Sequence, residues 1–485
     1  MESDNRLKRA LGKLDLTSLG VGAIIGTGIF VLTGIGAHDK AGPALIMSFV
    51  LSGMACVFAA LCYAEFASMV PVAGSAYTYA YATLGELFAW IIGWDLILEY
   101  AVSTATVAHG WSHYFQELLL PVGIVLPANL MRAPFDYSPA TGGFVATGSI
   151  MDFPALAISM IVTILLVRGV KESARFNDVM VALKLTVVLF VIVLGAFYIN
   201  PAHWTPFAPY GWTGISFFGN TLVGETGLGG EPLGMVAGAA MVFFAYIGFD
   251  AVSTQAEEAR NPSKDVPFGI IASLLICTVL YIAVTAVLTG MVPYRLIDVD
   301  APIAAAFASV GLPWAQFIIS FGAIAGITSV LIVMTLSQPR IFLAMARDGL
   351  LPKGFFGAIH PKYRTPHKST ILTGIFVGIL AAFLPLRVLA ELVNIGTLLA
   401  FVIVCSAVLV MRKTHPNAER PFRSPLFPWV PIAGIVFCAI LMFSLPSENW
   451  LRLFVWLAIG FIIYFTYGRK HSELAKYRAR QGNTE

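Results

Sequence analysis

The sequence predicts an all-α integral membrane protein with twelve transmembrane helices. Of its 485 residues, 58% are hydrophobic and only 12% are charged, and the mean hydropathy is +0.81, whereas soluble domains carry about 25% charged residues. A spanning helix needs about 20 mostly apolar residues. Twelve stretches meet this need, roughly 17–38, 42–70, 84–115, 151–168, 176–199, 234–258, 268–290, 313–345, 370–385, 388–411, 428–445 and 450–467. We expect one transmembrane domain over residues 1–485, surrounded by membrane lipid.

Basic residues predict the orientation of these helices, because lysines and arginines stay preferentially in cytoplasmic loops. With a cytoplasmic N-terminus, most of the 30 Lys and Arg residues fall on the cytoplasmic side. The exceptions are Lys40, Arg132, Arg295, Arg387 and Arg452 in outer loops and Lys184 within a span. We therefore expect a multi-pass protein of the cell (plasma) membrane with both termini in the cytoplasm. The net charge of +3 reflects this bias and does not indicate nucleic-acid binding.

The first span contains a glycine-rich stretch, GVGAIIGTGIF at residues 20–30. Glycine costs about 1 kcal/mol against alanine inside a helix, so this stretch predicts a break whose freed amides and carbonyls line a cavity. The alternative is an unbroken helix that packs closely through small residues such as Gly22 and Gly26.

A second interruption favours the break. In FFAYIGFDAVST at residues 243–254, Gly248 interrupts the sixth span and Asp250 follows it. Interrupted spans at matching positions of two halves are typical of transporters built from an inverted repeat. We expect five-plus-five repeats over about 14–200 and 234–412, with two additional helices over about 427–468.

The two breaks predict a site for a zwitterion. The half-helix that begins near Thr27 and Gly28 presents free amides and a positive dipole end, which suit a carboxylate. Carbonyls freed at the breaks suit an ammonium group. An α-amino acid carries both groups on one carbon, so its backbone needs no charged side chain here. The carbonyls expected to contact the amine belong to Ile24, Phe244, Ala245 and Ile247.

Lys184 lies in the otherwise apolar stretch 179–198. A lysine at bilayer depth costs roughly 3 kcal/mol on insertion scales, and such residues mark functional sites by default. The alternative is that the side chain snorkels to the nearby interface.

The third span carries Asp95 and Glu99 at i, i+4 spacing, and His109 and His113 repeat that spacing further on. The two histidines lack a third ligand in the sequence, so no metal site is predicted. For Glu99, contact with a cationic side chain, a part in a proton path and pairing within the bundle stay open. Asp95 is expected to be structural. The five cysteines are expected to be buried core residues.

The chain resembles the amino acid/polyamine/organocation (APC) superfamily, and within it the cationic amino acid transporter (CAT) branch, as a bacterial member. The resemblance rests on LCYAEF at 61–66, GSAYTYAY at 74–81, GELFAWIIGWDLILEY at 85–100, GFDAVSTQAEEARNPSKDVPFGI at 248–270 and PRIFLAMARDGLLP at 339–352. It implies the leucine-transporter-type fold with broken helices 1 and 6. It also implies carboxylate contacts at Thr27, Gly28 and Ile29, amine contacts at the four residues named above, and a gate at Phe244 with Asp250 at its inner end.

Two departures from the branch concern coupling and substrate. The mammalian members are facilitators with asparagine at the position of Lys184, whereas the resemblance to prokaryotic members with lysine there implies proton coupling. Sodium-coupled members of the fold hold a cation at positions that match Gly22, Ile25, Thr328 and Ser329, and the Lys184 ammonium can occupy that place.

Met334 replaces a small residue and fills room that an arginine side chain needs, which favours small neutral substrates such as alanine over cationic ones. The alternative for Met334 is that it faces lipid or core.

Together these features predict a secondary active transporter that carries L-amino acids, small neutral or cationic, by alternating access in symport with protons. An uncoupled exchanger or facilitator, and an amino-acid-sensing receptor on the same scaffold, remain alternatives. A membrane enzyme would need a clustered acid, base or metal constellation, which the sequence does not show. No cofactor is expected, and a small membrane subunit is left open.

Overall fold

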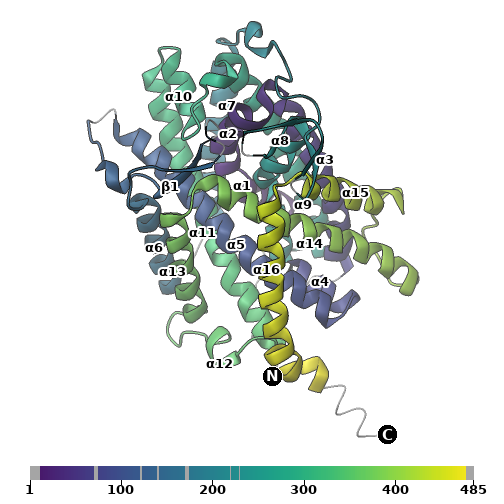
Figure 1. Cartoon of the computed structure of the whole chain (residues 1–485). Helices are drawn as coiled ribbons and strands as arrows, with labels where there is room; N and C mark the ends of the chain where they lie inside the picture. The colour runs from purple at the N-terminus through teal and green to yellow at the C-terminus, as the bar shows by residue number, and fades with distance from the viewer. Residues whose placement is uncertain are drawn as a thin grey trace, which may run out of the picture.

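The computed structural model describes residues 11–69, 75–120, 123–138, 141, 143–169, 174–218, 220–228 and 230–476, and nearly all of its regular structure is helical (Figure 1). The helices are α1 (Lys13–Ile24), α2 (Thr33–Gly36), α3 (Leu45–Met69), α4 (Ser75–Thr83), α5 (Glu86–Leu119), α6 (Phe153–Arg168), α7 (Ala174–Ala196), α8 (Met235–Val242), α9 (Pro262–Met291), α10 (Pro302–Ser309), α11 (Pro313–Arg347), α12 (Lys353–Phe356), α13 (His367–Phe383), α14 (Leu386–Thr414), α15 (Trp429–Phe443), α16 (Ser447–Ile463) and α17 (Arg469–His471).

Short 3-10 and π-helical turns connect or interrupt these helices. They are η1 (Gly28–Leu32), η2 (Ala37–Ala41), η3 (Gly42–Ala44), η5 (Ala128–Leu130), η6 (Pro201–Trp204), η7 (Phe243–Tyr246), η8 (Phe249–Glu258), η9 (Tyr294–Leu296) and η10 (Tyr464–Gly468).

Three small antiparallel ribbons lie in two long connections, one between α5 and α6 and the other between α7 and α8. β1 (Phe135–Ser138) pairs with β2 (Gly143–Ala146), β3 (Ile215–Phe217) with β4 (Asn220–Val223), and β5 (Glu225–Thr226) with β6 (Pro232–Leu233). We call the end of the bundle that carries β1 and β2 the hairpin end. The opposite end, where α1 begins and α17 lies, is the termini end (Figure 1).

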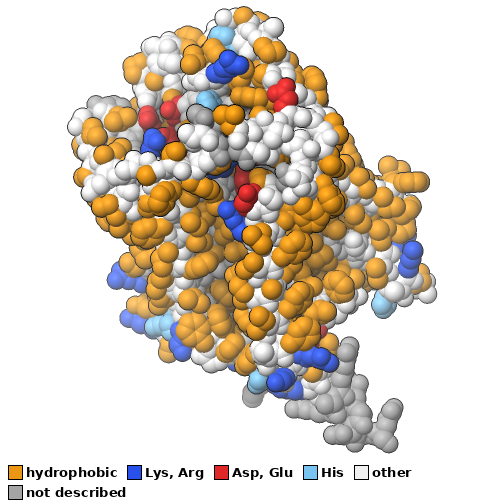
Figure 2. All heavy atoms as spheres, in the orientation of Figure 1, with side chains coloured by type: hydrophobic (Ala, Val, Ile, Leu, Met, Phe, Trp, Pro, Cys, Tyr) orange, Lys and Arg blue, Asp and Glu red, His pale blue; other side chains and the backbone are white. Residues whose placement is uncertain are grey.

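Eight helical stretches in the described part of the chain are long and apolar enough to cross a membrane, and the shorter apolar helices α6, α13 and α15 accompany them. Figure 2 shows apolar side chains over the middle of the visible face, with lysines and arginines gathered toward the termini end. The prediction of a multi-pass membrane protein is therefore confirmed, while the number of twelve crossings stays a prediction.

Both predicted helix breaks are present. α1 ends at Ile24, Ile25 is extended with φ −74° and ψ 104°, and helical structure resumes in η1 at Gly28. In the second break α8 leads into η7, Ile247 is extended with ψ 134°, and Gly248 takes φ +118°, which favours glycine, before η8 begins. The alternative of an unbroken first helix is wrong.

Helices α5, α9 and α11 surround these breaks. α5 and α11 pack along each other, α9 packs on α1 and α3, and α7 lies against α1, α9 and α11. At the last contact a Cβ on Gly326 would lie 3.0 Å from Cγ of Lys184. The absent side chain of Gly326 thus leaves the room through which Lys184 reaches α1.

All five cysteines are buried and free. Their prediction as core residues is confirmed.

Candidate functional site

A small cavity lies between the two helix breaks. Its volume is about 10 Å³, which is room for one water molecule but not for an amino acid. The side chains around it are buried, so the structure holds the site in a closed state. Its lining residues are Ala23, Ile24, Gly26, Thr27, Gly28, Ser103, Val107, Phe244, Ile247, Val330 and Met334.

Six of these lining residues belong to the substrate contacts proposed from the sequence: Ile24, Thr27, Gly28, Phe244, Ile247 and Met334. The lining also contains residues that the sequence did not single out. Among these, Ser103 is notable because its hydroxyl is buried without a hydrogen-bond partner in the described part of the chain. Nothing in the pattern around Ser103 distinguishes it from the other small polar residues of α5.

The two breaks touch through their backbones. A Cβ on Gly28 would lie 2.4 Å from the Cα of Ala245, a separation that real side chains do not adopt. Only glycine allows η1 and η7 to approach this closely.

Tyr281 of α9 joins the two breaks by hydrogen bonding. Its hydroxyl lies 2.9 Å from the carbonyl oxygen of Ile24 and 2.7 Å from that of Ala245. A hydroxyl has one hydrogen to donate, so it serves one of the two carbonyls at a time. Two of the carbonyls expected to contact a substrate amine therefore share one donor. Nothing in the sequence around Tyr281 indicates this role.

Of the three residues whose amides are expected to bind a carboxylate, only two border the cavity. The Ile29 amide donates to the Gly26 carbonyl at 3.2 Å, as does that of Phe30 at 3.3 Å, so Ile29 is engaged within its own turn and does not line the cavity. Thr27 and Gly28 lie at the start of η1 and border the cavity. The positive end of this half-helix therefore faces the site through Thr27 and Gly28.

Lys184 is fully buried, with 0% of its surface exposed, and its Nζ donates to the carbonyl oxygen of Gly22 at 2.6 Å. The alternative that this side chain snorkels to an interface is therefore wrong. Its partner Gly22 lies in the last turn of α1 before the break. The Lys184 amine therefore makes a direct hydrogen bond to the last turn of α1.

The other residues proposed around the cation position differ in their contacts. The Ser329 hydroxyl is buried and has no hydrogen-bond partner among the described residues. The Thr328 hydroxyl instead donates to the Ile324 carbonyl at 2.7 Å and accepts from Trp111 Nε1 at 2.9 Å. Ile25 is the extended residue of the break, and its amide donates to the Val21 carbonyl at 3.0 Å.

The acidic residues of the site lie on the side of the termini end. Glu99 is buried one helical turn before Ser103 and does not line the cavity. Asp250 accepts a hydrogen bond from the Tyr100 hydroxyl at 2.9 Å. Both oxygens of Asp95 are buried and lack a hydrogen-bond partner within the described ranges. The proposed gate residue Phe244 borders the cavity itself.

Met334 faces the site. It lines the cavity, and its ε-methyl lies 3.2 Å from where a Cβ on Gly248 would stand. The alternative that Met334 faces lipid is wrong.

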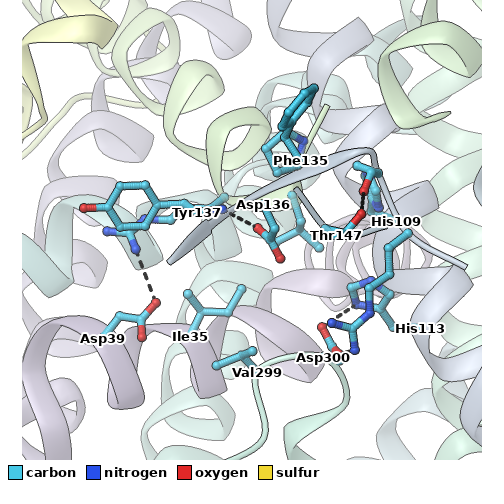
Figure 3. Close-up of a pocket in the computed structure, with 15 residues that line it drawn as sticks. Ile35, Asp39, His109, His113, Phe135, Asp136, Tyr137, Thr147, Val299 and Asp300 are labelled. Atoms are coloured by element: carbon cyan, nitrogen blue, oxygen red, sulfur yellow. Dashed lines mark hydrogen bonds and ion pairs between the residues drawn. The ribbon is translucent and has the colours of Figure 1, made fainter. Parts of the chain in front are cut away.

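The hairpin end is closed by charged side chains. Arg387 Nη1 lies 3.3 Å from Asp39 Oδ2, and its Nε lies 3.4 Å from Glu391 Oε1. Its guanidinium covers the ring of Tyr137 at 4.2 Å; Tyr137 and Asp39 are labelled in Figure 3. Cavities of about 60 and 210 Å³ border this cluster. In β1, outside the spanning helices, burial raises the pKa of the Asp136 carboxyl.

A third potential ligand, which the sequence did not show, lies beside His109 and His113. The structure brings Asp152, the residue that caps α6, to them, and potential ligand atoms of all three lie within 4.8 Å of one another. The sequence could not show this because the intervening loop folds back onto α5.

The chain is similar to known permeases and transporters over most of its length. A family model described as amino acid permease matches residues 11–468. The chain is 48% identical over 470 residues to a methylthioribose transporter of Bacillus subtilis and 49% identical over 472 residues to the branched-chain amino acid permease BcaP of the same organism, covering 97% of this chain and 95% of each relative. It is 39% identical to a vacuolar cationic amino acid transporter 4 of Arabidopsis thaliana, over 86% of this chain and 65% of that protein.

These relatives are transporters and permeases over nearly the whole chain, so this protein is a transporter rather than an enzyme. The resemblance inferred from the motifs is confirmed. The chain belongs to the amino acid permease family, as a bacterial member of the cationic amino acid transporter branch of the APC superfamily.

Proposed function

We propose that this protein carries small neutral L-amino acids across the cell membrane by alternating access, in symport with protons. The observation that carries the proposal is the contact of the buried Lys184 Nζ with the Gly22 carbonyl. This contact places an ionisable group against the same broken helix that borders the central cavity.

The proposed architecture has twelve transmembrane helices, with five-plus-five inverted repeats over about 14–200 and 234–412 and added helices over about 427–468. The two broken elements support it, since such breaks occur at matching positions of inverted repeats. The gathering of basic residues toward the termini end (Figure 2) supports cytoplasmic termini.

The cavity supports an amino acid as substrate through its backbone groups. Thr27 and Gly28 present the positive end of a half-helix, and the carbonyls of Ile24 and Ala245 share the single donor Tyr281. A substrate ammonium supplies the donors that these carbonyls lack. The half-helix end offsets the charge of the substrate carboxylate.

The cavity wall that would surround the side chain of the substrate supports a neutral substrate. No charged residue lines the described cavity, and Val107, Phe244, Ile247, Val330 and Met334 make its wall largely apolar. A cationic side chain would lose its hydration there without a carboxylate partner in the lining. The likeness to a branched-chain amino acid permease agrees with this assignment.

Proton coupling follows from the position of Lys184. An ammonium removed from water costs several kcal/mol, so the stability of the charged Lys184 depends on its hydrogen bond to the Gly22 carbonyl. Protonation therefore stabilises α1 packed against α7 and α11. Loss of the proton weakens this packing and releases α1 toward the open state, in which substrate exchanges with solvent.

Uptake into proteoliposomes tests this proposal. With purified protein, labelled alanine, leucine, arginine and methylthioribose are supplied with and without an inward proton gradient. A potential of 100 mV supplies about 2.3 kcal/mol per proton, so we expect roughly 50-fold accumulation of alanine that requires the gradient. Absence of any uptake contradicts transport and favours a receptor. Uptake that ignores the gradient favours a facilitator, and preference for methylthioribose over all three amino acids contradicts the substrate class.

A further inference from the structure

Two histidines and an aspartate meet at the hairpin end of α5, away from the central cavity. His109 and His113 are one helical turn apart on α5, and Asp152 caps α6. Both histidines border the cavity of about 60 Å³ shown in Figure 3. Transport as proposed above uses none of these three side chains.

Neighbouring groups determine which atoms of the cluster remain available. His109 Nε2 lies 2.6 Å from the Leu384 carbonyl oxygen, which only accepts hydrogen bonds, so Nε2 carries the hydrogen and Nδ1 of the neutral ring presents a lone pair. Asp152 Oδ1 accepts from the Ser112 hydroxyl at 2.6 Å and from the Ala155 amide at 3.0 Å, which leaves Oδ2. Metal-binding histidines are oriented in this way, with the second ring nitrogen donating to a carbonyl.

The available atoms face each other without hydrogen bonds. His109 Nδ1 lies 2.9 Å from Asp152 Oδ2, but the contact lacks hydrogen-bond geometry. Neither atom, nor the buried Nδ1 of His113, has a hydrogen-bond partner among the described residues. A lone pair beside a carboxylate oxygen is repulsive unless a cation lies between them. In a tetrahedral zinc site, bonds of about 2.0–2.1 Å place ligand atoms roughly 3.3 Å apart. Here the His109–Asp152 pair is slightly closer than this, and potential ligand atoms of all three residues lie within 4.8 Å of one another.

The surrounding charges favour a cation. Asp39, Asp136 and Asp300 line the same cavity, where Arg132 and Arg387 supply the positive charges. Asp300 Oδ1 lies 3.7 Å from His113 Nδ1 and pairs with Arg132. With Asp152 the carboxylates outnumber the guanidinium groups.

We propose that His109, His113 and Asp152 bind a divalent transition-metal ion such as Zn²⁺. Histidine nitrogen and carboxylate oxygen are common zinc ligands, and Asp300 or a water molecule from the adjacent cavity completes the coordination. The ion joins α5 to α6, and through Leu384 it is linked to the connection between α13 and α14.

Titration of the purified full-length protein in detergent with Co²⁺, after removal of any affinity tag, tests this site without reference to transport. We expect one bound ion per chain, a visible absorption band of four-coordinate cobalt, and displacement by Zn²⁺. His109→Gln and Asp152→Asn abolish the band. Ser112→Ala removes a hydrogen bond to Asp152 but no ligand, so we expect affinity to fall by about 10- to 100-fold.

Two substitutions serve as controls. His203→Gln changes a histidine that bonds to the Gly290 carbonyl outside the cluster, and His360→Gln changes one of two adjacent histidines, His360 and His367; both retain the band. His113→Gln leaves both hydrogen bonds to Asp152 Oδ1 in place and still loses the band, which separates ligand loss from misfolding. Absence of cobalt binding in the wild type overturns the proposal in favour of a proton held by His109. Equal binding in the wild type and in His113→Gln also overturns it.

Discussion

The two helix breaks around the central cavity are held by different kinds of groups. At the first, the Gly22 carbonyl accepts from Lys184, a side chain that can gain or lose a charge. Before the second, Asn394 Nδ2 donates to the carbonyls of Ala240 at 2.8 Å and Met241 at 3.0 Å, and the Tyr246 hydroxyl donates to the Phe49 carbonyl at 2.7 Å. These donors stay neutral.

This difference indicates a division of roles. In the proposed mechanism, protonation of Lys184 acts on α1, where it changes the free energy of packing against α7. The second break, with Phe244, Ile247 and the contact of Met334 with Gly248, helps to shape the cavity, and we propose that it selects the substrate side chain. Tyr281 and the Gly28 contact join the two breaks, so changes there should disturb both roles.

Gly28→Ala should have the largest effect, because the new Cβ would overlap the Ala245 backbone and push the two breaks apart. Overpacking of this kind costs about 1–3 kcal/mol, and we expect amino acid uptake to fall to background with a lower melting temperature. Gly143→Ala is the matched control, since nothing lies within 4 Å of its Cβ position. Normal uptake by Gly28→Ala would show that the contact between the breaks is not required.

Tyr281→Phe should have the next largest effect. It removes the donor shared by the Ile24 and Ala245 carbonyls, and leaving buried acceptors without a partner costs about 1–3 kcal/mol. We expect a corresponding loss of unfolding free energy in detergent, and partial recovery when alanine is added because its ammonium donates to the same carbonyls. Tyr198→Phe, at a partly exposed position, should change neither quantity. Equal stability of both variants would mean that Tyr281 does not join the breaks.

Met334→Ala should have the smallest effect and should act on the second break alone. It enlarges the apolar wall, and each additional buried CH₂ of a substrate contributes about 0.8 kcal/mol. We expect the ratio of leucine to alanine uptake efficiency to rise by about tenfold while dependence on the proton gradient is unchanged. Met291→Ala, at a buried methionine of α9 away from the cavity, should leave the ratio unaltered. A change in proton dependence instead would break the proposed division of roles.

The sequence predicted those features that depend on local chemistry. Glycines in apolar spans predicted both breaks, and a lysine in an apolar run predicted a special role for Lys184. Contacts between distant segments were not predictable in this way. Tyr281 looks like any aromatic residue of a span, Asp152 reaches His109 only because a loop returns to α5, and the Thr328 hydroxyl is engaged by Trp111 from a neighbouring helix.

The central claim is that Lys184 couples amino acid movement to protons, and lumenal pH in proteoliposomes loaded with a pH-sensitive dye tests it most directly. External alanine should acidify the lumen with the wild type, because each amino acid enters with a proton. Lys184→Ala should still exchange labelled for unlabelled alanine but should not acidify the lumen. Lys40→Ala is the matched control, since Lys40 is also buried and its Nζ lies 3.4 Å from the Pro232 carbonyl oxygen, at the hairpin end; it should acidify the lumen as the wild type does. Alanine-dependent acidification that persists in Lys184→Ala would contradict the account.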